Sequence, residues 1–229
     1  MTRLGILGGM GPAASAEFIT RLIKQTPATC DQEHIPFVLW NEPRIPDRST
    51  SMRAGNDDPL PWLQDGIRGL KAAGCDCIVI PCNSAHFWYG ELCKLDVPII
   101  HIVDSIATEL LSLHLDNQPI GVMGTQGTIE YGIYQYKLEQ QGLKCLVPDR
   151  NEMDFFVQPA IDLIKRGQLE EAQLLLIQVI HSLIDRGAKA IVLGCTELPL
   201  AIRIASEEGI PIVNSIDSLV ESALKHLRS

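Results

Sequence analysis

Long apolar runs, excess positive charge and paired cysteines are all missing from this 229-residue sequence. No apolar run reaches the roughly 18 residues of a membrane-spanning helix, and the N-terminus breaks into glycines before a signal-type apolar region develops. The formal net charge of −9 disfavours nucleic acid or an anionic membrane as a partner, because both would repel the protein. We therefore expect a cytoplasmic protein that binds neither.

The seven cysteines do not resemble a disulfide framework or a zinc site. Their number is odd, and none of them forms a Cys-x-x-Cys pair. This usage suits a reducing compartment in which thiols stay free. We expect no metal site, and we expect some of the thiols to take part in chemistry.

Short apolar runs alternate with segments of helical periodicity along the whole chain. The runs typical of strands are residues 4–7, 37–40, 77–80, 99–103, 120–123, 145–147, 190–193 and 210–213. Helical spacing covers residues 14–25, 59–73, 104–114, 131–141, 155–166 and 169–186. With 46% hydrophobic residues, the chain has ample material for a core, and the alternation predicts an α/β fold with mainly parallel sheets.

An internal repeat divides the chain into two similar halves. Residues 4–12 correspond to residues 120–128, residues 73–83 to 186–196, and residues 97–105 to 210–218, at offsets of 113 to 116 positions. We expect two pseudo-symmetric α/β domains, 1–115 and 116–229, with the active site in the cleft between them. The terminal strand or helix of each half can pack on the other half.

The repeat places a cysteine at the end of a strand in each half, Cys82 in the first and Cys195 in the second. Ligands bind outside the carboxyl ends of parallel strands, so a twofold arrangement makes the two thiols face each other across one cleft. Each cysteine precedes residues that suit a helix start, whose dipole is expected to lower the thiol pKa. A single cysteine after a buried strand is more often inert, but the symmetric placement favours catalysis. Two opposed thiols suit racemisation or epimerisation, because one removes a proton while the other protonates the opposite face.

Four motifs carry a resemblance to a known family over nearly the whole chain. They are residues 8–12 (Gly-Gly-Met-Gly-Pro), 46–48 (Pro-Asp-Arg), 81–86 (Pro-Cys-Asn-Ser-Ala-His) and 194–198 (Gly-Cys-Thr-Glu-Leu). They resemble the aspartate/glutamate racemase family in its aspartate racemase branch. The resemblance implies a two-domain fold, no pyridoxal phosphate or other cofactor, no metal, and a homodimer. It also implies that Cys195 acts on the L-enantiomer and Cys82 on the D-enantiomer.

The same resemblance implies an acidic amino acid as substrate and suggests how it is held. Developing charge on the α-carboxylate needs hydrogen-bond donors, for which Asn83, Ser84 and Thr196 are the candidates. The family has threonine where this chain has Ser84, a departure that keeps the hydroxyl. The remaining candidates are two cations for the side-chain carboxylate, two wall residues and a partner for the ammonium group: Arg48, Lys165, Met10, Gly11 and Glu197.

Several candidates also have a structural interpretation. Arg48 lies in a polar loop and Lys165 suits a helix end, while His86, His101 and Asp104 are more often structural than second-layer groups of a site. The other cysteines have no repeat partner and are expected to be inert: Cys30, Cys75, Cys77, Cys93 and Cys145.

Three other functions remain open from the residues alone. A nicotinamide-dependent oxidoreductase is the first, because residues 9–14 satisfy the Gly-x-Gly-x-x-Ala form of a dinucleotide site. The acidic partner of such a site is badly placed, since the second strand ends near Glu42, more than 30 residues beyond Gly9 instead of about 20. A related isomerase of the maleate isomerase or hydantoin racemase type would keep both thiols, and a binding module would leave them unreactive. Aspartate and glutamate differ by one methylene, worth only about 1–3 kcal/mol of discrimination.

Overall fold

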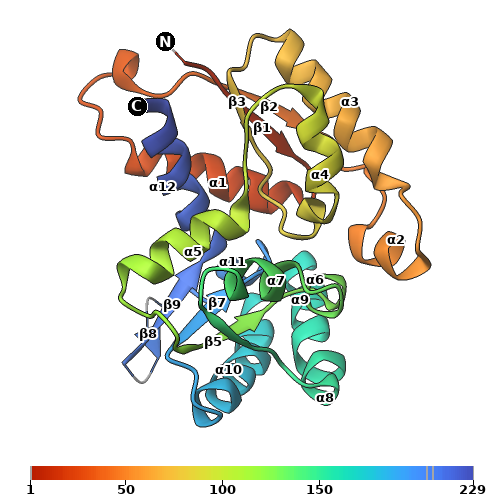
Figure 1. Cartoon of the computed structure of the whole chain (residues 1–229), viewed down its shortest axis with the longest axis vertical. Helices are drawn as coiled ribbons and strands as arrows, with labels where there is room; N and C mark the ends of the chain where they lie inside the picture. Colours follow the sequence, from red (N-terminus) through yellow and green to blue (C-terminus); the bar gives the residue numbers. More distant parts are fainter. Residues whose placement is uncertain (1, 205, 208, 229) are drawn as a thin grey trace.

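Two parallel β-sheets lie one above the other in the computed structural model, which describes residues 2–204, 206–207 and 209–228 (Figure 1). The upper sheet has the strand order β2-β1-β3-β4, and the lower sheet has the order β6-β5-β7-β9-β8. The strands are β1 (Leu4–Gly8), β2 (Phe37–Asn41), β3 (Cys77–Val79), β4 (Ile99–Ile100), β5 (Pro119–Met123), β6 (Lys144–Leu146), β7 (Ala190–Leu193), β8 (Ser206–Glu207) and β9 (Ile210–Asn214). All neighbours pair in parallel except β8, which runs antiparallel to β9. The predicted fold class is confirmed, and the common order of the first four strands in each sheet is the structural form of the sequence repeat.

Helices flank both sheets. They are α1 (Pro12–Gln25), α2 (Arg48–Ala54), α3 (Pro59–Ala72), α4 (Tyr89–Leu92), α5 (Ile102–Ser112), α6 (Gln126–Glu130), α7 (Ile133–Glu139), α8 (Arg150–Glu152), α9 (Gln158–Lys165), α10 (Leu169–Asp185), α11 (Leu198–Ala201) and α12 (Ser215–Arg228). Short 3-10 helices cover Asp31–Glu33, Ser84–Trp88 and Cys93–Leu95, and a π-helical turn covers Met153–Val157.

The central strands of both sheets are buried on both faces. Every residue of β1, β3 and β7 is buried, as expected when helices cover a parallel sheet on each side. In each sheet the order in which successive strands are added reverses at one point. This point lies between β1 and β3 in the upper sheet and between β5 and β7 in the lower sheet. Such a switch point is where parallel sheets bind ligands, and Cys82 and Cys195 follow β3 and β7 there.

The two halves exchange their last helices. α5, which follows the upper sheet, packs against α7 and β9 of the lower half. α12, which follows the lower sheet, packs against α1, α5 and β4, and Figure 1 shows it beside α1. Buried side chains of both halves, among them Ile6, Phe18, Ile106 and Leu219, therefore belong to one continuous core cluster.

Local hydrogen bonding explains where the structure departs from the predicted boundaries. The strand predicted over 99–103 ends at Ile100, because the side chain of His101 accepts a hydrogen bond from the Val103 N–H (3.1 Å) and starts α5. The helix predicted over 131–141 begins only at Ile133, because Gly132 has a φ of 65°. The predicted ranges contain no counterpart of strand β8 or of the helices α2, α4, α6, α8, α11 and α12.

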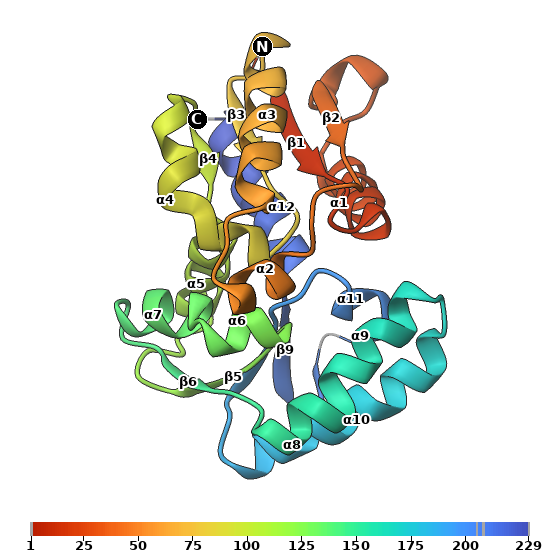
Figure 2. The same cartoon turned by 90° about the vertical axis from the view of Figure 1, so that its right-hand side faces the viewer.

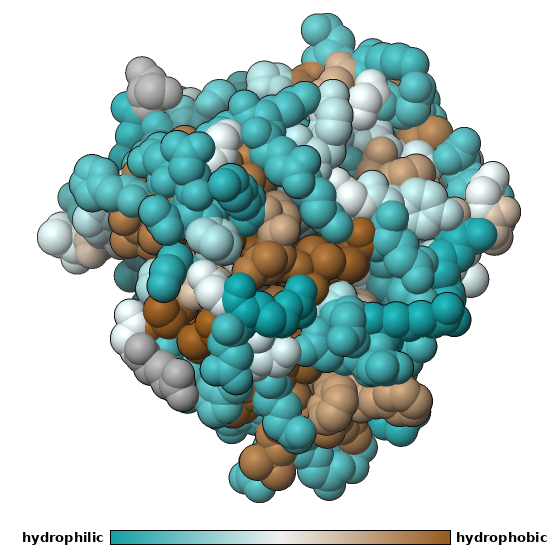
Figure 3. Space-filling model, turned by 60° about the horizontal axis from the view of Figure 1, so that its bottom comes forward, coloured by the Kyte–Doolittle hydropathy of each residue, from teal (hydrophilic) through white to brown (hydrophobic). Residues whose placement is uncertain are grey.

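The halves also meet through α2 and α6, which lie side by side in Figure 2. Seen from below in Figure 3, the surface is mostly hydrophilic with a few apolar patches. No helix in the described part of the chain is long and apolar enough to cross a bilayer.

Candidate active site

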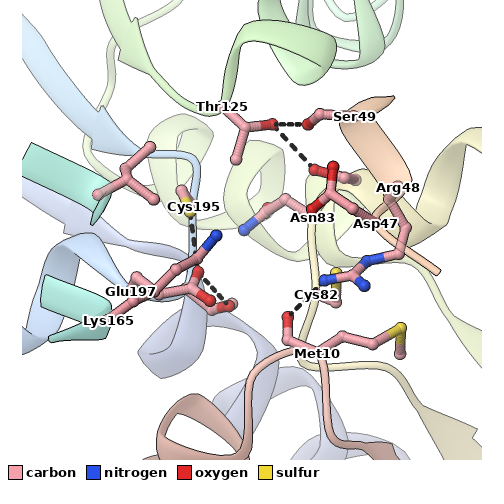
Figure 4. A pocket seen from close by; sticks show the side chains of 13 residues that line it. Met10, Asp47, Arg48, Ser49, Cys82, Asn83, Thr125, Lys165, Cys195 and Glu197 are labelled. Atoms are coloured by element: carbon pink, nitrogen blue, oxygen red, sulfur yellow. Dashed lines mark hydrogen bonds between the residues drawn. The ribbon is translucent and has the colours of Figure 1, made fainter. Parts of the chain in front are cut away.

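A cavity of about 340 Å³, including its open mouth, lies between the two halves (Figure 4). It is built from the loops that follow β1, β3, β5 and β7, the start of α2 and one face of α9. Nine of the ten predicted site residues line it, all except Gly11. The lining residues are Met10, Asp47, Arg48, Ser49, Cys82, Asn83, Ser84, Thr125, Ile161, Lys165, Cys195, Thr196 and Glu197.

The two predicted thiols enter this cavity from opposite halves. Figure 4 shows Cys195 on one side and Cys82 on the other. Both are buried, with 3% and 5% of their surface exposed. The other five cysteines do not line this cavity, and all seven are free thiols. The arrangement that the repeat predicted is thus present.

The Cys195 thiol donates a hydrogen bond to a buried carboxylate. Its sulfur lies 2.9 Å from Glu197 Oε2. Burial raises the pKa of Cys195 well above its usual value, and the negative charge and hydrogen bond of Glu197 raise it further. The Glu197 backbone N–H opposes this rise without reversing it. The prediction that a helix start lowers this pKa is therefore wrong, because α11 is only four residues long and burial outweighs its dipole.

Cys82 lies in a different electrostatic environment. Burial again raises the thiol pKa, but the Arg48 guanidinium opposes the rise. Glu197 adds a smaller increase. The expected lowering of the Cys82 pKa is wrong too, because burial outweighs the groups that favour the thiolate. The two thiols are thus unequal: a cation favours the thiolate of Cys82, whereas an anion favours the protonated form of Cys195.

The N-cap of α2 fixes Arg48. Asp47 accepts a hydrogen bond from the Thr50 N–H (2.8 Å), which makes Arg48 the first residue of the helix. The guanidinium donates to the carbonyls of Ile45 (3.1 Å) and Pro46 (3.0 Å), and it lies 3.5 Å from the Met10 carbonyl. Its Nε is buried and has no hydrogen-bond partner within the described residues. A donor of this kind is available to a carboxylate in the cavity.

Lys165 supplies the second cation of the site. It is the last residue of α9, its side chain is exposed, and its ammonium group has no ion pair or hydrogen bond within the described residues. Figure 4 shows it beside Glu197 and across the cavity from Arg48. The two cations therefore lie on either side of the space between the thiols.

The residues that follow each cysteine bind the opposite half. Asn83 donates to Ser215 Oγ (3.2 Å) and accepts from the Tyr134 hydroxyl (2.5 Å). Thr196 donates to the carbonyl of Pro81 (3.2 Å). These hydrogen bonds orient the two side chains. One N–H of the Asn83 amide and the neighbouring backbone N–H groups stay available to a ligand.

Ser84 belongs to a chain of hydroxyl groups. Its Oγ lies 3.0 Å from Thr125 Oγ1 and 2.9 Å from Thr128 Oγ1, and Ser49 donates to Thr125 Oγ1 (2.9 Å). The chain links α2, the loop after β3 and α6. Ser84, which stands where the family has threonine, therefore uses its hydroxyl in the contact between the two halves.

The glycine turn after β1 brings Met10 into the cavity. Gly9 has a φ of 98°, and a Cβ there would lie 2.5 Å from the Glu42 backbone, so only glycine fits. Gly11 lines a neighbouring cavity rather than this one, which corrects its predicted place in the wall. The same contact disfavours a dinucleotide site, because Glu42 packs on the turn and its carboxylate pairs with Arg44 (2.7 Å).

Four residues of the cavity were absent from the predicted site: Asp47, Ser49, Thr125 and Ile161. Thr125 was detectable, since it stands in the second copy of the glycine turn. The other three residues lie outside the repeated stretches, so the repeat could not identify them.

The histidines near Cys82 are structural. His86 lies 2.9 Å from the Cys82 carbonyl through Nδ1, and its Nε2 accepts from the Ile102 N–H (3.3 Å), which assigns the proton to Nδ1. Burial lowers the pKa of His86 to about 4, and burial also lowers that of His101. Asp104 pairs with Lys137 (2.7 Å) outside the cavity. Among the described residues, no group of three or more His, Cys, Asp or Glu side chains is placed to hold a metal ion.

Comparisons with known proteins point to one family. The family model of Asp/Glu/Hydantoin racemases matches residues 7–223. The broad specificity amino-acid racemase RacX of Bacillus subtilis is 30% identical over 228 residues, which cover 96% of this chain and 96% of that protein. The Picrophilus torridus aspartate racemase structure superposes with a TM-score of 0.84 at 30% identity, covering 99% of this chain and 94% of that one. An aspartate racemase homologue from Pyrococcus horikoshii shares the fold, with a TM-score of 0.80 at 21% identity over the whole of both chains.

Proposed function

This chain belongs to the Asp/Glu/hydantoin racemase family, and from that premise we propose that it interconverts L- and D-aspartate without a cofactor, by passing protons between two thiols. The observation that carries the proposal is the entry of Cys82 and Cys195 into one cavity from opposite halves. The similarity to an aspartate racemase over nearly the full chain favours aspartate over glutamate. The similarity to a broad specificity racemase favours a site that also accepts other amino acids.

The proposed reaction starts from an unequal pair of thiols. Arg48 makes the Cys82 thiol the easier of the two to ionise, whereas Cys195 is held as a thiol bonded to Glu197. Once Cys82 has lost its proton, a D-enantiomer can react: the Cys82 thiolate removes the α-proton and the Cys195 thiol protonates the opposite face. The L-enantiomer needs the reverse state, in which Cys195 has lost its proton.

The substrate's charges complement the charges of the cavity. Its ammonium group pairs with Glu197, which draws that carboxylate away from the Cys195 thiol and neutralises the charge that keeps the thiol protonated. Its side-chain carboxylate binds between Arg48 and Lys165. The Asn83 N–H and the backbone N–H groups after each cysteine stabilise the charge that develops on the α-carboxylate.

Incubation of the reduced protein with L-aspartate, L-glutamate and L-alanine, without added cofactor, tests the proposal. We expect the D-isomer of aspartate on chiral chromatography, less from glutamate and least from alanine. Cys82→Ala and Cys195→Ala should each abolish racemisation, and the serine variants should be nearly as inactive, because a hydroxyl ionises far less readily than a thiol. Cys93→Ala, at an exposed thiol outside the cavity, is the control. Racemisation at the parent rate by either active-site variant would remove that thiol from the mechanism.

A further inference from the structure

A second cavity adjoins the catalytic one. It encloses about 700 Å³, including its open side, between the first turn of α1 and the helices α9 and α11. Three residues line both cavities: Arg48, Lys165 and Glu197. These three side chains therefore stand at the boundary between the two spaces, beside the backbone that joins Met10, which lines the first cavity, to Gly11, which lines the second.

The second cavity differs from the first in chemistry. Apart from the three shared residues, its walls are glycine, proline, alanine, isoleucine and leucine, among them Ala13, Ile164 and Leu200. None of these side chains carries a charge or a hydrogen-bonding group. The catalytic cavity, in contrast, is lined mostly by polar side chains. A substrate side chain that crosses the boundary thus passes from polar to aliphatic surroundings.

The boundary contains one fixed and one movable side chain. Arg48 is held by the backbone carbonyls of Ile45 and Pro46, as described above. Lys165 is exposed and makes no ion pair or hydrogen bond within the described part of the chain, so its long stem can turn aside. A carboxylate stops at this boundary because it pairs with the cations, whereas an uncharged chain gains by continuing into the aliphatic cavity.

We propose that this second cavity, called here the aliphatic chamber, receives substrate side chains too long for the catalytic cavity, so that the enzyme also racemises amino acids with unbranched apolar side chains. Norleucine and methionine are the substrates that fit this chemistry. The inference rests on the proposed racemase function and extends it from acidic amino acids to a second class.

Filling the chamber from α1 tests the inference. Ala13 is exposed and lines the chamber, so Ala13→Leu adds bulk there without burying it in the core. Ala16→Leu, at an exposed position of α1 outside the lining, is the matched control. Leu200→Phe fills the chamber from the opposite wall and guards against misfolding of the first variant. The measurement is kcat/KM for L-norleucine, L-methionine and L-aspartate, followed by chiral chromatography.

We expect the parent enzyme to racemise all three amino acids. Ala13→Leu should lower kcat/KM for norleucine and methionine by about tenfold or more, the effect of one or two misplaced methylenes, and should change the value for aspartate by less than about twofold. Ala16→Leu should change none of them. Racemisation of aspartate but not of norleucine or methionine by the parent would overturn the inference and leave the racemase function intact. An equal loss for all three substrates in both chamber variants would make the cavity an entrance and also overturn it. Inactivity of the parent on every amino acid would instead remove the proposed function.

Discussion

At the scale of single residues, one carboxylate and one guanidinium make two chemically identical thiols unequal. Glu197 holds Cys195 as a hydrogen-bond donor, and Arg48 favours the thiolate of Cys82. The sequence predicted that both side chains belong to the site but assigned both to the substrate. Their effect on the thiols depends on burial and on distances of a few ångströms, which a motif does not specify.

Replacement of Glu197 by glutamine is expected to move the pH profile downward. The Cys195 pKa is raised, first by burial and then by Glu197, so conversion of L-aspartate by the Cys195 thiolate increases as pH rises through that pKa. Removal of the negative charge lowers the pKa, and the rise in kcat/KM then occurs at lower pH. KM should also increase, because the ammonium group loses its partner.

Glu170→Gln, at an exposed position of α10, is the control for the loss of one negative charge. Its kcat/KM profile against pH should match the parent profile. An unchanged or upward-shifted profile in Glu197→Gln would contradict the role given to this carboxylate.

At the scale of elements, the sequence predicted the strands better than the helices that position the site. The glycine turns, the strand ends and the cysteines repeat along the chain, so the sheets and Cys82 and Cys195 could be found from the pattern. α2 has no repeat partner and only seven residues, too few for a clear helical period. The position of α2 depends on contacts with α6 of the other half, and the two helices lie far apart in the sequence.

The contact between α2 and α6 should control activity through Arg48. A Cβ at Gly127 in α6 would lie 2.6 Å from Met52 Cε and 2.9 Å from the Ser49 backbone. Gly127→Ala should therefore push α2 away and cost about 1–3 kcal/mol in the free energy of unfolding. Because a displacement of ~1 Å in a site can cost about a hundredfold, we expect kcat/KM for aspartate to fall by at least about tenfold.

Gly90→Ala is the matched control, since a Cβ there meets no atom within 4 Å and the residue does not have a positive φ. Thermal unfolding and steady-state kinetics of the two variants make the comparison. Parent-like kinetics in Gly127→Ala would show that α2 is not positioned by this contact.

At the scale of the whole molecule, the exchange of α5 and α12 joins two halves that look separate in sequence. The division at residues 115 and 116 follows from the repeat, but the core does not stop there. The homodimer implied by the family resemblance also stays a prediction. A repeat reveals equivalent segments, whereas packing between them is set by side chains that are far apart in the chain.

Neither half should fold alone. A fragment of residues 1–115 lacks α12, whose buried Leu219 and Val220 join the core beneath the upper sheet, and it leaves the inner face of α5 uncovered. We expect one cooperative thermal transition for the full chain, and none for the fragments 1–115 and 116–229, by circular dichroism and calorimetry. A cooperative transition of either fragment near the full-chain Tm would show that the halves are independent folding units.

The central claim is that two different thiols exchange protons with opposite faces of one carbon. Racemisation of L-aspartate in D2O, stopped in the first few per cent of conversion and analysed by mass for each enantiomer, tests it most directly. The account predicts deuterium at the α-carbon of nearly all the D-aspartate and almost none in the remaining L-aspartate, because the thiol that donates the new proton has exchanged with solvent. Equal labelling of both enantiomers, or D-aspartate that retains the original proton, would contradict it.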